Sequence, residues 1–138
     1  MSRENSTKKD LYFTSDHEWI DFQGSVAYVG VCHFKLIGFR EVQQLIFNEP
    51  SNLSKKGDVI ASVRYNDYRV DIHMPVDGKI VQVNKSLIAG NLNILLQHPQ
   101  TNGWVAMISP SQPYERKDLL LPKHYHMLPA IKMQKSSV

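Results

Sequence analysis

Hydrophobic and polar residues alternate most clearly in the middle of the chain. Apolar Val70, Ile72 and Met74 are separated by polar Arg69, Asp71 and His73. Successive side chains of a strand point to opposite faces, so this pattern predicts a strand over residues 69–74 with one buried face. The apolar run 59–63 predicts the strand before it. Between the two runs lie Tyr65, Asn66, Asp67 and Tyr68, and Asn and Asp tolerate the left-handed backbone of a tight turn. We therefore expect a β-hairpin over residues 59–74 with residues 66 and 67 at its tip.

The rest of the pattern predicts further short strands and a helix near the C-terminus. Strands are expected over residues 25–31, 79–83 and 104–108, each bounded by turn residues. Ser111 and Pro113 are typical of a helix start, so a helix is predicted over residues 113–121, with Pro122 ending it. Many short strands with few helices indicate a mainly β fold, built as a small sandwich or barrel with a C-terminal helix.

Length and composition indicate one ordinary domain with short tails. The chain has 138 residues, 42% of them hydrophobic, which is enough to bury a core. Residues 1–10 are polar and lack the apolar segment of a signal peptide, so we expect a tail and a cytoplasmic protein. No apolar run approaches the ~20 residues of a membrane helix.

Cys32 is the only cysteine, which excludes a disulfide within the chain. We expect Cys32 to be buried and to act as a small hydrophobic residue.

The positive charge is mild and spread along the chain. The net charge is +3 and the isoelectric point is about 9.0. Nucleic-acid-binding proteins usually show a denser basic stripe with aromatic residues between the charges, so a nucleic-acid partner is not expected.

Residues that could support catalysis or bind a metal do not form a recognisable motif. Six histidines are present, but only His124 and His126 are close in sequence, and residues two apart on a helix point to different faces. We therefore expect no metal site.

His73 lies at an outward position of its predicted strand, where we expect it to be solvated. Asp16, His17 and Glu18 are consecutive, which favours a surface loop over convergence on one point. No nucleophile elbow, phosphate-binding loop or dinucleotide fingerprint appears, so no catalytic residue is expected and the chain is predicted not to be an enzyme.

Several segments, in this order and spacing, resemble the H protein of the glycine cleavage system. They are LYFTSDHEWI at residues 11–20, residues 25–31, Lys55-Lys56-Gly57-Asp58, residues 75–84, Gly103-Trp104, and Leu119, Leu120 and Tyr125. The resemblance covers residues 11–129, which we take as the domain, with tails at 1–10 and 130–138. It implies a barrel-sandwich hybrid fold, as in lipoyl and biotinyl carrier domains.

The resemblance also implies a function, and one substitution departs from it. Family members carry lipoate on a lysine at a hairpin tip and pass an aminomethyl group between the P, T and L proteins. Counting forward from Gly57 and backward from Pro75 places that lysine at Asp67, and Arg64 replaces a glutamate of the family pattern. A carboxylate offers no amine for lipoylation, so no cofactor is expected.

The sequence therefore predicts a non-catalytic H-like binding module, an adaptor or regulator that is not lipoylated. Its predicted interaction residues are Tyr65, Asn66, Asp67 and Tyr68, because tyrosine is common at contact hot spots. The two tyrosines could equally brace the hairpin. The alternative function is a carrier or assembly component that still acts with the P, T or L proteins, through another lysine. A membrane partner is not expected.

Overall fold

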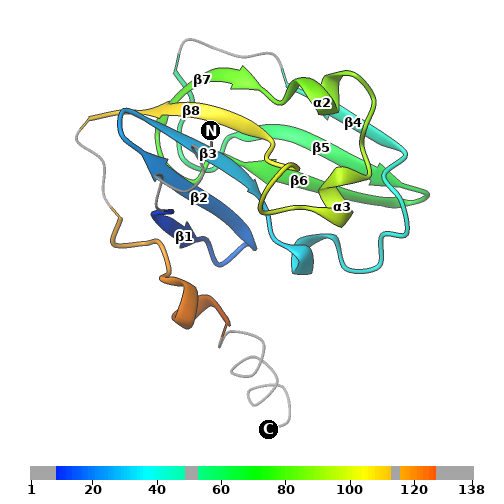
Figure 1. Cartoon of the computed structure of the whole chain (residues 1–138), viewed down its shortest axis with the longest axis horizontal. Helices are drawn as coiled ribbons and strands as arrows, with labels where there is room; N and C mark the ends of the chain where they lie inside the picture. Colours follow the sequence, from blue (N-terminus) through cyan, green and yellow to red (C-terminus); the bar gives the residue numbers. More distant parts are fainter. Residues whose placement is uncertain (1–8, 49–52, 113–115, 127–138) are drawn as a thin grey trace, which may run out of the picture.

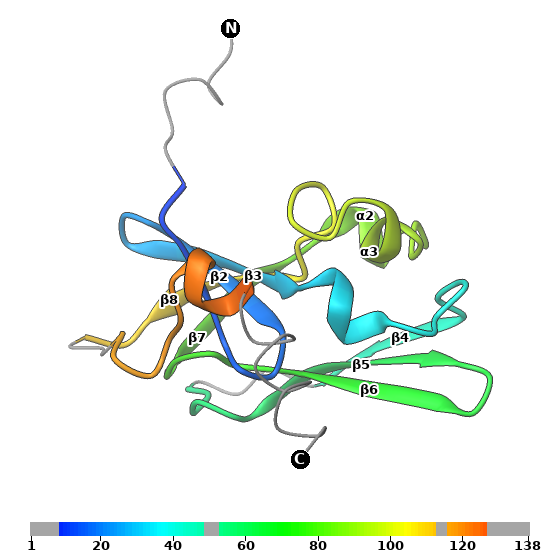
Figure 2. The same ribbon diagram turned by 90° about the horizontal axis from the view of Figure 1, so that it is seen from below.

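The strands pair into two antiparallel sheets that face each other (Figures 1 and 2). The computed structural model describes residues 9–48, 53–112 and 116–126. The five-stranded sheet has the order β1-β2-β3-β8-β7, with β1 Leu11–Phe13, β2 Glu18–Gln23, β3 Val26–Val31, β7 Gly78–Val83 and β8 Ala106–Pro110. The three-stranded sheet has the order β4-β5-β6, with β4 Gln44–Phe47, β5 Val59–Tyr65 and β6 Tyr68–His73.

The hydrophobic core lies between the two sheets. Ile20, Val29 and Ile108 of the five-stranded sheet are fully buried, as are Val63 and Ile72 of the three-stranded sheet. Burial of a side chain of this size contributes roughly 1.5–3 kcal/mol, so this interface stabilises the fold. The predicted mainly β architecture is confirmed.

Among the described residues, three short helical segments connect the strands. They are the 3-10 helix η1 His33–Leu36 and the helices α2 Lys85–Ile88 and α3 Ile94–Gln97. Asn84 begins α2 as its cap, because its Oδ1 accepts a hydrogen bond from the Ser86 backbone N–H at 3.0 Å. None of the helices in the described part of the chain is long and apolar enough to cross a membrane.

The predicted hairpin is confirmed. Strands β5 and β6 are antiparallel, and the last pair before the turn is Tyr65 opposite Tyr68. Asn66 and Asp67 form the turn, and Asn66 has the positive φ of 53° that the sequence led us to expect there. The hairpin projects to the edge of the molecule, with its tip away from the C-terminal segment (Figure 2).

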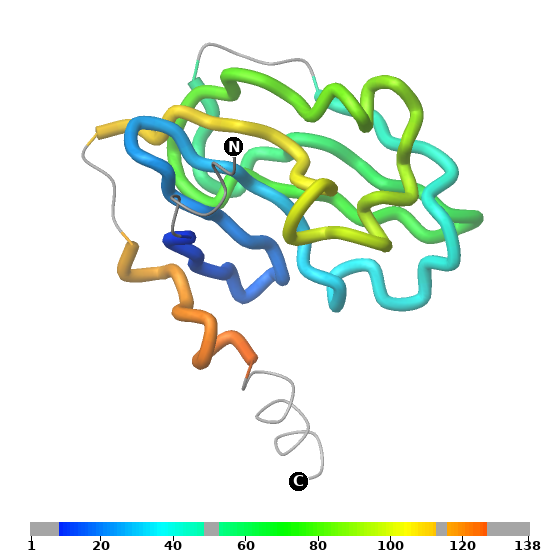
Figure 3. Tube along the Cα trace, viewed as in Figure 1, coloured from blue at the N-terminus to red at the C-terminus, as the bar shows by residue number. Residues whose placement is uncertain are grey.

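A C-terminal helix is present, but its predicted position was wrong. Residues 116–121 contain no helix, residues 113–115 lie outside the described residues, and helix covers the described residues 122–126. The backbone of Leu120 forms two hydrogen bonds with Phe13, of 2.8 and 2.7 Å, and this extended pairing excludes a helix there. Pro122 begins the helix instead of ending it, because a missing N–H is tolerated in a first helical turn. Figure 3 shows this segment running past β1.

Tyr125 fixes the C-terminal segment to the five-stranded sheet. Its ring stacks on Phe13 with 4.4 Å between centroids, and its hydroxyl lies 2.8 Å from His17 Nδ1. Cys32 is buried in the same cluster, as expected, and burial raises the pKa of its thiol to about 11. Because only the thiolate is nucleophilic, Cys32 is a packing residue.

Candidate functional site

A side chain from outside the hairpin is hydrogen-bonded to its tip. Gln43 Oε1 accepts a hydrogen bond from the Asn66 backbone N–H at 2.7 Å, and Gln43 Nε2 donates to Asn66 Oδ1 at 3.3 Å. Gln43 directly precedes β4, so these bonds tie the turn to the neighbouring strand. Asp67 is exposed beside this fixed residue. The tip therefore displays the Asp67 carboxylate next to a residue that is hydrogen-bonded to the segment before β4.

Three aromatic rings pack together at the tip, and we call them the aromatic cluster: Phe39, Tyr65 and Tyr68. The ring centroids lie 5.9 Å apart for Phe39 and Tyr65, 6.0 Å for Phe39 and Tyr68, and 6.3 Å for the two tyrosines. Phe39 and Tyr65 are half-buried, whereas Tyr68 is 57% exposed. The cluster thus contains two supporting rings and one ring that is available for contact.

The hairpin also carries two arginines directly opposite each other. Arg64 of β5 pairs in register with Arg69 of β6. Arg69 Nε donates to Asp71 Oδ1 at 3.1 Å, and the Ser62 hydroxyl donates to the same oxygen at 2.7 Å. The Ser62 hydrogen bond, and then the hydrogen bond and charge of Arg69, hold the pKa of the Asp71 carboxyl below its ordinary value despite an opposing effect of burial. Arg64 forms no ion pair with any residue that the structure describes, so its charge is open to a partner.

A second group of polar side chains converges between the sheets, and we call it the Glu18 cluster: Asp16, Glu18, Lys35 and His73. The Glu18 side chain is 2% exposed. Its Oε2 accepts from the His73 backbone N–H at 2.8 Å and lies 2.9 Å from His73 Nδ1 and 3.1 Å from Lys35 Nζ. Asp16 Oδ2 lies 2.8 Å from Lys35 Nζ and 3.1 Å from His73 Nδ1.

Two predictions were wrong at this cluster. His73 was expected to be solvated, but it is half-buried and bonded to Glu18. Asp16 and Glu18 were expected to diverge on a surface loop, but both side chains meet at Lys35. His17 between them has a positive φ of 66°, which turns the backbone so that its two neighbours reach the same point. The partners lie 17 and 55 residues beyond Glu18, so no local pattern indicates them.

The Glu18 cluster is a charge network in which a lysine already supplies the cation. Ligand atoms of Asp16, Glu18 and His73 lie within 4.8 Å of one another, a spacing that could hold a metal ion. The Lys35 ammonium, however, contacts both carboxylates, so an added metal would meet a positive charge there. Burial raises the pKa of the Asp16 carboxyl, but the hydrogen bond and charge of Lys35 lower it more, with a net pKa below the ordinary value.

Phe39 and Gln43 were not identified from the sequence as neighbours of the tip. Both belong to the segment between β3 and β5, and they reach the hairpin through the pairing of β4 with β5. The four predicted interaction residues, Tyr65, Asn66, Asp67 and Tyr68, do lie together at the tip.

Comparison with known proteins identifies the class and then the family. The fold is that of a crystal structure of a glycine cleavage system H protein from Mycobacterium marinum, with a TM-score of 0.73, 22% identity, and coverage of 90% of this chain and 99% of that chain. The two sheets are thus a barrel-sandwich hybrid. A family model described as glycine cleavage H-protein matches residues 11–130.

Curated relatives agree with the family match. The chain is 30% identical to the probable glycine cleavage system H protein of Aeropyrum pernix over 118 residues, which is 86% of this chain and 82% of that protein. It is also 30% identical to the glycine cleavage system H protein of Bartonella tribocorum, over 85% of this chain and 95% of that protein. The chain belongs to the glycine cleavage H-protein family.

Proposed function

We propose that this chain is an H-type protein that does not carry lipoate and acts by binding other proteins, as an adaptor or regulator. The family bears lipoate and works with the P, T and L proteins of glycine cleavage. The observation that supports the proposal is Asp67 in the turn of the hairpin. Counting from Gly57 and from Pro75 assigns this position to the modified lysine of the family pattern.

The chemistry of the tip does not fit lipoate. Lipoylation forms an amide with a side-chain amine, and the Asp67 carboxylate has none to offer. Residues 59–73, which span both strands and the turn, contain no lysine. The next lysines along the chain, Lys79 and Lys85, belong to β7 and α2 and not to the hairpin. A lipoyl arm on either of them would start from a different part of the molecule.

The tip has the features of a protein-contact surface. Aromatic and arginine side chains dominate contact hot spots, and the tip offers exposed Tyr68 together with Arg64. Tyr65 is half-buried between Phe39 and Tyr68, which suits a brace of the hairpin. The two tyrosines thus have different roles: Tyr68 is the contact residue, and Tyr65 supports it. The Gln43 bonds would lower the entropic cost of presenting Tyr68.

A tip variant should separate docking from a general surface effect. Tyr68→Ser is expected to weaken binding to the partner among the P, T and L proteins of the same host by roughly thirtyfold, the effect of losing a hot spot of about 2 kcal/mol. Ile88→Ser is the matched control, because Ile88 is an equally exposed apolar residue on α2. Calorimetric titration of each variant against each protein measures the difference. Equal weakening by both substitutions, or no binding by the unmodified chain, would contradict docking through the tip.

The alternative is a carrier that uses another lysine, and intact mass distinguishes it. After co-expression with a lipoate ligase, the mass of the purified chain should equal that of the unmodified sequence. A lipoylated H protein made in the same cells shows that the ligase is active. A mass increase matching a lipoyl or octanoyl group on any lysine would overturn the proposal and favour the carrier.

A further inference from the structure

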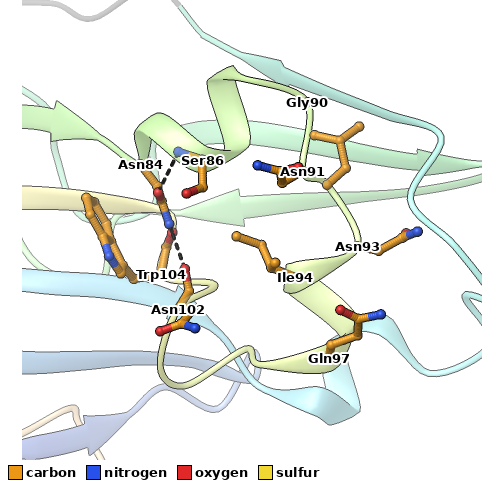
Figure 4. A pocket seen from close by; sticks show the side chains of 10 residues that line it. Asn84, Ser86, Gly90, Asn91, Asn93, Ile94, Gln97, Asn102 and Trp104 are labelled. Carbon is orange, nitrogen blue, oxygen red and sulfur yellow. Dashed lines mark hydrogen bonds between the residues drawn. The ribbon is translucent and has the colours of Figure 1, made fainter.

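A hollow of about 570 Å³ lies between α2, α3 and the residues before β8 (Figure 4). This volume is within the usual range of small-molecule sites. Side-chain amides make up much of its lining: Asn84, Asn91, Asn93, Gln97 and Asn102. No charged residue is among the lining residues. We call it the amide hollow.

The wall of the amide hollow is fixed by Asn84. This residue is buried, and its Nδ2 donates to the backbone carbonyls of Asn102 at 2.9 Å and Trp104 at 2.7 Å. Its Oδ1 accepts from Ser86 in the first turn of α2. One side chain thus joins α2 to the segment that leads into β8. A wall held by three hydrogen bonds keeps its shape when the hollow is filled.

Other amides of the hollow remain available for a ligand. The side chains of Asn91, Gln97 and Asn102 form no hydrogen bond with any residue that the structure describes. Asn93 differs, because its Oδ1 accepts from the Val42 backbone N–H at 2.9 Å and it points away from the hollow in Figure 4. Each available amide offers an oxygen acceptor and an NH₂ donor.

Trp104 gives the hollow one aromatic wall. Its half-buried ring packs against Tyr28 with 5.2 Å between centroids, which holds the indole in place. Trp104 also lines a smaller hollow of about 200 Å³, together with Tyr28 and Thr101. A ligand longer than one ring could therefore contact the indole from the amide hollow and extend past it.

We propose that the amide hollow binds a neutral carbohydrate of one or two sugar rings. A sugar hydroxyl both donates and accepts a hydrogen bond, as a carboxamide does, so uncharged amides can pair with neighbouring hydroxyls. The C–H face of a sugar ring is apolar and packs on an indole face. Without a charged side chain in the lining, the hollow has no group that would select an ionic ligand over a neutral one.

The test uses the full chain and three probes: maltose, cellobiose and N,N′-diacetylchitobiose. The indole N–H signal of Trp104 in ¹H–¹⁵N spectra should shift saturably with at least one probe. Trp19, the other tryptophan, lines the smaller hollow, so its signal should shift only with a probe that extends past Trp104. Asn91→Ala combined with Gln97→Ala should weaken binding by about tenfold, the effect of losing two neutral hydrogen bonds.

The matched control removes two amides elsewhere on the surface. Gln44→Ala combined with Gln82→Ala changes exposed glutamines of β4 and β7, and it should leave the affinity unchanged. No saturable shift with any of the three probes would overturn the proposal, as would equal weakening by the control pair. Neither result depends on the modification state of the tip, so the proposal is independent of the proposed function.

Discussion

Replacing Lys35 with methionine should lower the free energy of unfolding by about 3 kcal/mol, the lower end of the cost of breaking a buried ion pair from one side. Methionine keeps all but the last atom of the lysine side chain's length and removes the cation that contacts Glu18 Oε2 at 3.1 Å. Glu18 is almost fully buried and would be left with the His73 backbone N–H and ring as its remaining partners. Urea denaturation of the variant and of the unmodified chain measures the difference.

Two further variants give this prediction its controls. Lys56→Met breaks the Lys56–Asp118 pair, whose side chains are 51% and 64% exposed, and it should cost less than about 1 kcal/mol. Adding Glu18→Gln to Lys35→Met should recover part of the stability, because a neutral amide does not need a cation. If Lys35→Met costs no more than Lys56→Met, the Glu18 cluster does not contribute to stability as described.

The pH dependence of the same variant has a definite sign. Lys35 holds the pKa of the Asp16 carboxyl below its ordinary value of 3.8, so Asp16 contributes stability above that pH and loses it as the pH falls through the lowered pKa. Without Lys35, the pKa of the Asp16 carboxyl should return most of the way to its ordinary value. The stability of Lys35→Met should therefore fall less steeply in acid than that of the unmodified chain.

Local signals predicted the hairpin correctly, and longer-range contacts explain the errors. The alternation at residues 69–74 and the Asn66-Asp67 turn are properties of neighbouring residues, so the sequence contains enough to place them. The predicted helix over residues 113–121 failed because Leu120 pairs with Phe13, more than a hundred residues earlier. The pattern of residues within one segment cannot indicate such a contact.

The same distinction applies to the candidate site. Spacing within one segment placed Asp67 at the tip, and the structure has it in the turn. Alternation alone predicted that His73 is solvated. In the structure, the His73 side chain of β6 contacts Glu18 of β2, which belongs to the other sheet. Gln43 and Phe39 carry no motif of their own. Their importance comes only from the strand pairing that brings them to the hairpin.

Changing Asp67 to lysine should allow lipoylation of a chain that otherwise stays unmodified. The substitution places an amine at the tip, where the family pattern has its modified lysine. Asp67 is exposed and does not share the positive φ of Asn66, so lysine can adopt its backbone conformation without strain. A surface change of this kind costs within about 0.5 kcal/mol. The Gln43 bonds to Asn66 do not involve the Asp67 side chain and should persist.

The extent of modification should depend on Arg64. A ligase that recognises the family's glutamate at this position would meet a positive charge in its place, so Asp67→Lys alone should be modified in part. Adding Arg64→Glu should increase the modified fraction. It also places a carboxylate directly opposite Arg69, which exchanges a repulsive cross-strand pair for an attractive one and favours the folded hairpin.

Intact mass and peptide mapping after co-expression with a lipoate ligase measure both variants. Asp67→Arg is the matched control, because it reverses the charge at the tip in the same way but cannot form the lipoyl amide, and it should gain no mass. The expected order is no modification for Asp67→Arg, partial modification for Asp67→Lys and fuller modification for the double variant. If both lysine variants stay folded and gain no mass, the tip is not presented to the ligase as in the family. The absence of an amine at Asp67 would then not be what separates this chain from a lipoyl carrier.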